Sequence, residues 1–94
     1  MSSPETDFSR ERAWRDAKAA KEDHASADES VNRALCWREV ERHLESVKTI
    51  LDIGAATGAF SIPLAQRGFT VTHLDFSPAM LAIARERAKG ITTI

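Results

Sequence analysis

Two glycines, four positions apart, follow a short apolar run and precede a helical pattern. The run from Thr49 to Ile53 is short and β-branched, which favours a strand over a buried helix. Gly54 and Gly58 permit positive φ angles, so the backbone between strand and helix can approach a ligand closely. The helix expected from about Phe60 to Arg67 points its first N–H groups at this loop. The segment therefore predicts a seat for an anionic or oxygen-rich group, as in the first half of a nucleotide-binding fold.

A second strand ends in a carboxylate. Residues 70–75 are rich in β-branched side chains and finish with Asp75, about twenty residues after Gly54, the interval at which an acidic residue meets a ribose diol. A carboxylate suits that task because it accepts hydrogen bonds from both hydroxyls at once. The alternative is a solvated aspartate at the end of a strand.

The loop has a more specific resemblance. The spacing Asp52-x-Gly54-x-Ala56-x-Gly58 resembles the first motif of the class I S-adenosylmethionine-dependent methyltransferases, acidic-x-Gly-x-Gly-x-Gly. Ala56 stands where the middle glycine is usual, which predicts some backbone strain or a looser cofactor fit. The dinucleotide fingerprint Gly-x-Gly-x-x-Gly fits worse, because it needs glycine where the chain has Ala56 and Ala59.

The resemblance covers about Thr49 to Ala88, and it implies a set of cofactor contacts. In the family, the residue after the strand-end acid and one in the next helical turn flank the adenine ring, which here points to Phe76 and Met80. Ordinary packing of the helix on the sheet explains these two side chains equally well. The residues that the resemblance assigns to S-adenosylmethionine are Asp52, Gly54, Ala55, Ala56, Thr57, Gly58, Asp75, Phe76 and Met80.

Three polar residues receive smaller roles. In the family, the acid at Asp52 positions the loop and the amino-acid tail of the cofactor, although it can also simply cap the loop amides. Thr57 is a candidate donor to the cofactor carboxylate. Arg33 would pair with that carboxylate if its helix forms a lid, but a solvated helix face is the simpler interpretation.

No other catalytic or metal-binding pattern is present in the sequence. His24, His43 and His73 have no metal-ligand spacing, and Cys36 is the single cysteine. We expect His73 to be a buried histidine with satisfied hydrogen bonds rather than a catalytic one. The sequence therefore predicts no metal and identifies no catalytic residue.

Two helices are predicted before the first strand, from Phe8 to about Glu22 and from about Glu29 to Leu44. Residues 24–28 are interpreted as a break, with Asp28 or Ser30 as the N-cap of the second helix. The first helix has a thin apolar stripe that includes Phe8 and Trp14. The second has a clearer apolar face, formed by Val31, Ala34, Leu35, Trp37, Val40 and Leu44.

The order of elements predicts an α/β protein. Gly68 marks the end of the helix expected from about Phe60 to Arg67. Ser77 and Pro78 mark the start of the next helix, and Gly90 marks its end. Residues 91–94 are interpreted as the opening of a third strand. We therefore predict the N-terminal half of a Rossmann-like, doubly wound parallel sheet, with a helical lead-in or cap at 1–46 and the start of the cofactor-binding domain at 47–94.

Composition narrows the class of protein. The 94 residues carry a formal net charge of −1, which gives no strong nucleic-acid signal. No segment approaches the roughly 20 apolar residues of a membrane span, and the N-terminus lacks the apolar region of a signal peptide. A single cysteine suits a reducing compartment, so the sequence predicts a cytoplasmic protein without a membrane partner.

The sequence thus predicts an S-adenosylmethionine-dependent methyltransferase whose acceptor is unknown and is a small molecule, a tRNA or a protein. The alternatives are an NAD(P)-binding oxidoreductase domain and a truncated, non-catalytic fragment. For the isolated 94 residues we expect no methyltransferase activity. We also expect self-association, because the first strand would be left with an unpaired edge.

Overall fold

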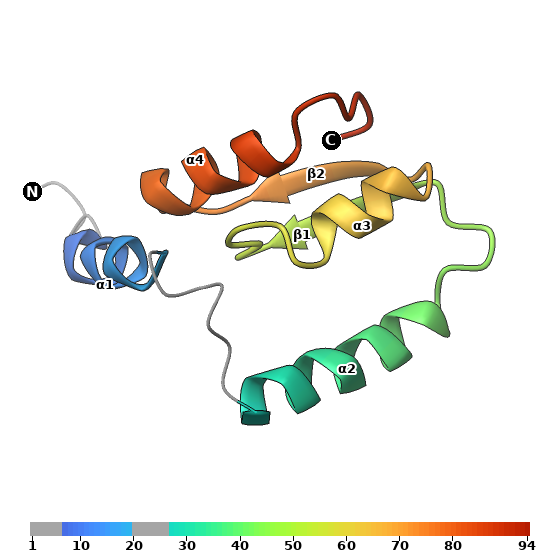
Figure 1. The fold of residues 1–94 in the computed structure, drawn as a ribbon, viewed down its shortest axis with the longest axis horizontal. Helices are drawn as coiled ribbons and strands as arrows, with labels where there is room; N and C mark the ends of the chain where they lie inside the picture. The colour runs from blue at the N-terminus through green and yellow to red at the C-terminus, as the bar shows by residue number, and fades with distance from the viewer. Residues whose placement is uncertain (1–6, 20–26) are drawn as a thin grey trace, which may run out of the picture.

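The computed structural model describes residues 7–19 and 27–94. Its elements are α1 (Ser9–Ala19), α2 (Ala27–Glu41), β1 (Thr49–Ile53), α3 (Ser61–Gln66), β2 (Thr70–Leu74) and α4 (Pro78–Arg87) (Figure 1). The two strands pair in parallel and form a two-stranded sheet, and α3 connects β1 to β2 along the chain. This arrangement confirms the α/β class and the parallel pairing predicted from the sequence.

The register of the sheet places the two strand ends side by side. Thr49 pairs with Thr70 and Ile53 with Leu74, so β1 and β2 finish at the same edge. The pairing continues one step further, because the N–H of Ala55 donates to the carbonyl of Leu74 at 3.0 Å. The glycine loop and Asp75, the residue that follows β2, therefore lie next to each other.

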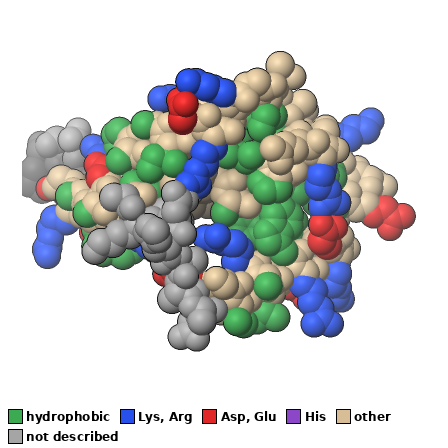
Figure 2. Space-filling model, viewed as in Figure 1, with side chains coloured by type: hydrophobic (Ala, Val, Ile, Leu, Met, Phe, Trp, Pro, Cys, Tyr) green, Lys and Arg blue, Asp and Glu red, His purple; other side chains and the backbone are tan. Residues whose placement is uncertain are grey.

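The core lies between α3 and the sheet. Leu64 and Ala65 of α3 pack on Val71 of β2, and all three side chains are buried. Trp37 of α2 reaches this cluster, with its ring centroid 4.9 Å from that of Phe60. Apolar side chains gather between α3 and α2 in Figure 2, with Lys and Arg side chains around them.

The two N-terminal helices take different positions. In Figure 1, α1 lies beyond the end of the sheet, beside the start of α4, whereas α2 lies along the opposite side of α3. The radius of gyration is 15.0 Å, larger than the roughly 12 Å of a compact domain of this length. The helices thus extend outward from a small α/β unit.

Several helix boundaries differ from the predictions. α1 ends its described part at Ala19, so its predicted continuation to Glu22 lies outside the described residues, as do His24 to Ser26. Asp28 and Ser30 are not N-caps, because α2 already begins at Ala27 and includes both. α2 also ends at Glu41 rather than Leu44, in a turn closed by the bond from the N–H of His43 to the carbonyl of Val40.

The predicted apolar face of α2 is only partly correct. Trp37, Val40 and Leu44 pack against the core, but Val31 and Leu35 are more than half exposed. The cause is that α2 touches the α/β unit along its C-terminal half. The thin apolar stripe predicted for the first helix is that of a surface helix, and Phe8 and Trp14 are indeed 52% and 61% exposed.

Two strand predictions are also wrong. β1 is not a buried strand within this chain, because Leu51 and Ile53 are 59% and 71% exposed. Residues 91–94 do not form a strand either. They make one strand-like bond, from the N–H of Val71 to the carbonyl of Thr93 at 2.7 Å, and a single bond does not establish a ladder.

The predicted turn residues are confirmed. Gly68 and Gly90 have φ angles of +100° and +84° after the ends of α3 and α4. Ser77 caps α4 by accepting a hydrogen bond from the N–H of Met80, and Pro78 is the first residue of that helix.

The predicted self-association of this chain concerns the free edge of β1 and the exposed apolar face of the sheet. Within residues 7–19 and 27–94, no strand pairs with the second edge of β1. Leu51, Ile53 and Leu74 lie on one face of adjacent strands, and all are more than half exposed. Self-association of this chain stays a prediction.

No helix in the described part is long and apolar enough to cross a membrane.

Candidate functional site

The loop between β1 and α3 is built on positive φ angles. Gly54, Ala56 and Gly58 have φ angles of +67°, +52° and +96°. At Gly58 a Cβ would lie 2.6 Å from the Cδ1 of Ile62, so the Ile62 side chain would have to shift to admit one. Nothing lies within 4 Å of the corresponding point at Gly54, so the loop is open at that position.

Ala56 is the unusual member of the loop. Its φ of +52° is left-handed, a conformation that costs an L-residue about 1–2 kcal/mol relative to the right-handed form. The predicted backbone strain is therefore present at the position where the motif usually has glycine. The surrounding bonds hold it in place, since the N–H of Ala56 donates to Asp75 at 2.8 Å and its carbonyl contacts His73.

The carboxylate of Asp75 joins three parts of the structure. Its Oδ2 accepts from the N–H of Ala56 at 2.8 Å, and its Oδ1 accepts from the N–H of Ser77 at 2.9 Å. Arg15 of α1 donates to both oxygens, from Nε at 3.2 Å and from Nη2 at 2.5 Å. The Asp75 side chain is fully buried in this arrangement. The glycine loop, the start of α4 and α1 therefore meet at one carboxylate.

A second carboxylate from α1 binds the start of α4. Asp16 accepts from the hydroxyl of Ser77 and, at 3.3 Å, from the N–H of Ala79. Negative charge at a helix N-terminus is favourable, because the first N–H groups carry partial positive charge. Arg15 and Asp16 together fix α1 at the end of the sheet where both strands finish.

The ionisation of Asp75 follows from these contacts. Burial of the carboxyl opposes its ionisation, but the guanidinium of Arg15 and the N–H groups of Ser77 and Ala56 outweigh burial. They hold the pKa of Asp75 below its ordinary value of 3.8. The carboxylate is therefore an anion at neutral pH, as a hydrogen-bond acceptor requires.

A separate hydrogen-bond chain supports the loop from the core side. The hydroxyl of Ser61 donates to Asp52 at 2.6 Å and contacts the Nδ1 of His73 at 2.9 Å. The Nε2 of His73 lies 2.9 Å from the carbonyl of Ala56. Both ring nitrogens of His73 have hydrogen-bond partners, as predicted, but the side chain is half-buried rather than buried. Asp52 anchors the start of α3 in this arrangement, and its contact with a cofactor stays a prediction.

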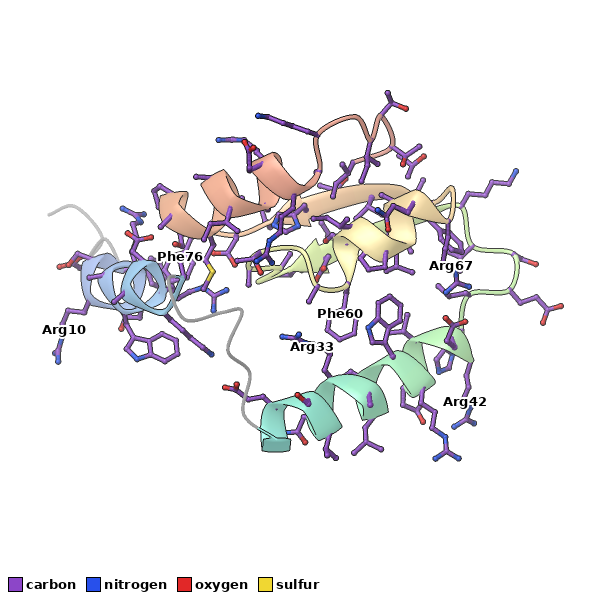
Figure 3. All side chains as sticks on the ribbon, in the orientation of Figure 1. Arg10, Arg33, Arg42, Phe60, Arg67 and Phe76 are labelled. Atoms are coloured by element: carbon purple, nitrogen blue, oxygen red, sulfur yellow. The ribbon has the colours of Figure 1, made fainter. Side chains whose placement is uncertain are left out.

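The remaining predicted cofactor residues differ in accessibility. Thr57 is 2% exposed, and its hydroxyl accepts from Arg87 at 3.0 Å. Met80 is 1% exposed, so no ligand reaches it in this arrangement. Phe76 is 40% exposed and lies beside α1 (Figure 3), where the guanidinium carbon of Arg15 is 5.8 Å from its ring centroid.

A groove of about 750 Å³ opens beside Phe76. Its lining residues are Arg10, Glu11, Trp14, Arg15 and Phe76. The groove therefore borders Arg15, the partner of Asp75, and its walls carry aromatic, basic and acidic side chains. Arg33 extends from α2 toward the α/β unit (Figure 3).

The predicted anion seat at the start of α3 is smaller than expected. α3 has six residues, and the N–H groups of Ile62 and Leu64 already donate to the carbonyls of Gly58 and Phe60, at 3.0 and 3.1 Å. Pro63 has no N–H to offer.

Sequence analysis missed four residues of this region: Arg15, Asp16, Ser61 and Arg87. Arg15 and Asp16 act some 60 positions away in the chain, and no local pattern marks such a contact. Ser61 had a local signal, since it is the first residue of a helix after a strand that contains Asp52. In the part of the chain that the structure describes, no group of three or more His, Cys, Asp or Glu residues is placed to hold a metal.

Comparison with known proteins agrees with this geometry. Residues 50–94 match the model of a family described as a methyltransferase domain. The chain is 49% identical over 61 residues to the demethylmenaquinone methyltransferase of Tropheryma whipplei, covering 62% of this chain and 26% of that protein. It is 39% identical over 57 residues to the EEF1A lysine methyltransferase 2 of Danio rerio, covering 60% and 24%.

A Bacillus subtilis protein that carries the name putative methyltransferase YqeM is 42% identical over 51 residues, which cover 54% of this chain and 21% of that protein. Residues 50–94 are therefore similar to part of a methyltransferase domain, in agreement with the resemblance that the motif spacing carries. The chain spans about a fifth to a quarter of the length of these relatives.

Ala56→Gly tests the strain in the loop. Glycine removes a left-handed conformation worth about 1–2 kcal/mol but adds roughly 0.5–1 kcal/mol of ordering entropy. We expect the free energy of unfolding to stay equal or rise by up to about 1 kcal/mol. Urea unfolding measures this change. The matched control is Ala55→Gly. Ala55 has no positive φ, so glycine there should lower the free energy of unfolding. Equal destabilisation of both variants would contradict strain at Ala56.

Acid should release the contacts of Asp75. Because its folded pKa is lowered, the ionised form contributes stability that is present above its unfolded value of about 3.8 and lost as the pH falls through the folded pKa. We expect the free energy of unfolding to drop below about pH 4 and the Asp75→Asn variant to lack this part of the drop. Urea unfolding across that pH range measures it, with Glu45→Gln as a control for an exposed carboxylate. A wild-type profile that matches Asp75→Asn would contradict the assignment.

Proposed function

We propose that this chain provides the S-adenosylmethionine-binding part of a methyltransferase, with the cofactor domain starting near residue 47. The observation that carries the proposal is the bond at 2.8 Å from the N–H of Ala56 to the carboxylate of Asp75. It unites the glycine loop with the strand-end acid at the carboxyl ends of two parallel strands, where ligands of such sheets bind. The family match at residues 50–94 supports the same proposal.

The proposed contacts follow from accessibility. Asp75 would accept from the ribose hydroxyls, and the open backbone at Gly54 would face the amino-acid tail of the cofactor. Phe76 would meet the adenine from the wall of the groove beside α1. Met80 and Thr57, which are buried, would contribute by supporting the site.

When bound, S-adenosylmethionine would supply an electrophilic methyl group, which passes to the acceptor as its bond to the sulfonium sulfur breaks and S-adenosylhomocysteine leaves. The contribution of the protein to such a reaction is largely the positioning of acceptor against donor. Within this chain, Asp75 and the loop orient the cofactor, and no described residue is assigned to the acceptor. The relatives carry names that refer to a quinone precursor and to a protein lysine, so the acceptor class stays open among small molecules, tRNA and proteins.

Direct binding tests the proposal. Calorimetry on the full-length protein that contains this chain should show binding of S-adenosylhomocysteine and none of NAD⁺. Asp75→Asn should weaken that binding by about 30- to 150-fold, the equivalent of about 2–3 kcal/mol for a pair of charge-assisted hydrogen bonds.

The control for the loss of one negative charge is Glu45→Gln, which changes an exposed carboxylate outside the site. Thermal unfolding of both variants separates loss of binding from loss of the fold. Binding of NAD⁺ in place of S-adenosylhomocysteine would favour the oxidoreductase alternative. Binding of neither would favour a non-catalytic fragment.

A further inference from the structure

The carboxylate proposed to bind ribose already has its acceptor sites filled. A carboxylate offers about four lone-pair sites, and Asp75 accepts four hydrogen bonds in the structure. Two come from the backbone of Ala56 and Ser77, which belong to the loop and to the start of α4. The other two come from one side chain, Arg15. The side chain of Asp75 is 0% exposed and that of Arg15 is 21% exposed, so Arg15 covers the carboxylate from the solvent side.

A ribose diol and a guanidinium edge present the same pattern to a carboxylate. Each offers two neighbouring donors to two oxygens, and the guanidinium adds a positive charge. The backbone donors cannot leave without dismantling the loop and the cap of α4. Arg15 is therefore the donor that a diol must replace, and the two cannot hold the carboxylate at the same time.

The attachment of α1 suits a reversible contact. Ala19 is its only described residue that is buried, while Phe8 and Trp14 are more than half exposed. The described contacts that fix α1 are mainly polar: Arg15 with Asp75, and Asp16 with the start of α4. The rings of Phe8 and Phe76 make an edge-to-face contact, with their centroids 6.3 Å apart. A helix with such a small apolar interface can undock without exposing a core.

We propose that Arg15 is a built-in competitor of the cofactor, which holds α1 over the ribose position until the cofactor displaces it. This proposal rests on the proposed function of the same site. In the absence of cofactor, Arg15 neutralises a carboxylate whose burial without a partner would be costly. When cofactor binds, the diol takes the two sites of Arg15, and α1 loses its main ionic anchor.

Calorimetry with S-adenosylhomocysteine on the full-length protein tests the sign of this effect. Arg15→Ala removes the competitor, and we expect it to bind the ligand about 5- to 10-fold more tightly than wild type, a change of about 1–1.4 kcal/mol. Arg12→Ala removes an exposed arginine from the same helix, one with no described contact to Asp75, and should bind as wild type does. Equal or weaker binding by Arg15→Ala, with wild type binding normally, would overturn the proposal and leave the proposed function intact. If neither protein binds the ligand, both fall together.

Hydrogen exchange on the wild-type protein gives a second readout that does not depend on the folding of Arg15→Ala. Saturation with S-adenosylhomocysteine should speed exchange of the α1 amides, because the helix is released. Slower or unchanged exchange would mean that α1 stays docked over the bound ligand, and the proposal would be wrong.

Discussion

The structure depends on one buried carboxylate. Asp75 accepts from the glycine loop, from the start of α4 and from α1, so three segments that are distant in sequence share a single anion. Each donor by itself is an ordinary hydrogen bond, but together they offset the burial of the charge and keep the group ionised. The same position, at the end of two parallel strands, is where a cofactor with hydroxyl groups would bind in this fold class. Structural support and the proposed recognition therefore use the same atoms.

The sequence predicted the local parts of this arrangement well. The strand, the glycine turn and the cap at Ser77 follow from short-range rules of backbone conformation, and all three are present. The strain at Ala56 was likewise predictable, because alanine occupies a position whose neighbours in the motif are glycines. The strand-end position of Asp75 came from a family resemblance and from spacing, and the structure places it against the loop as expected.

Contacts between distant segments could not be predicted from the sequence. No local pattern in the sequence marks Arg15, and its contact with Asp75 depends on the docking of α1. The apolar face of α2 failed for a related reason. Val31 and Leu35 have helical spacing, but a face is buried only where another element covers it, and α2 is covered along its C-terminal half. Leu51 and Ile53 show the same principle in the sheet, since a strand with a free edge and an uncovered face leaves its apolar side chains exposed.

Hydrogen exchange at two backbone amides, measured without cofactor, tests the central role of Asp75 most directly. If its carboxylate binds the loop and the start of α4 together, the amides of Ala56 and Ser77 are protected in the wild-type protein, and Asp75→Asn accelerates exchange at both. An Ala56 amide that exchanges as fast as one in an unstructured loop, or an Asp75→Asn variant that leaves both amides protected, would contradict the account.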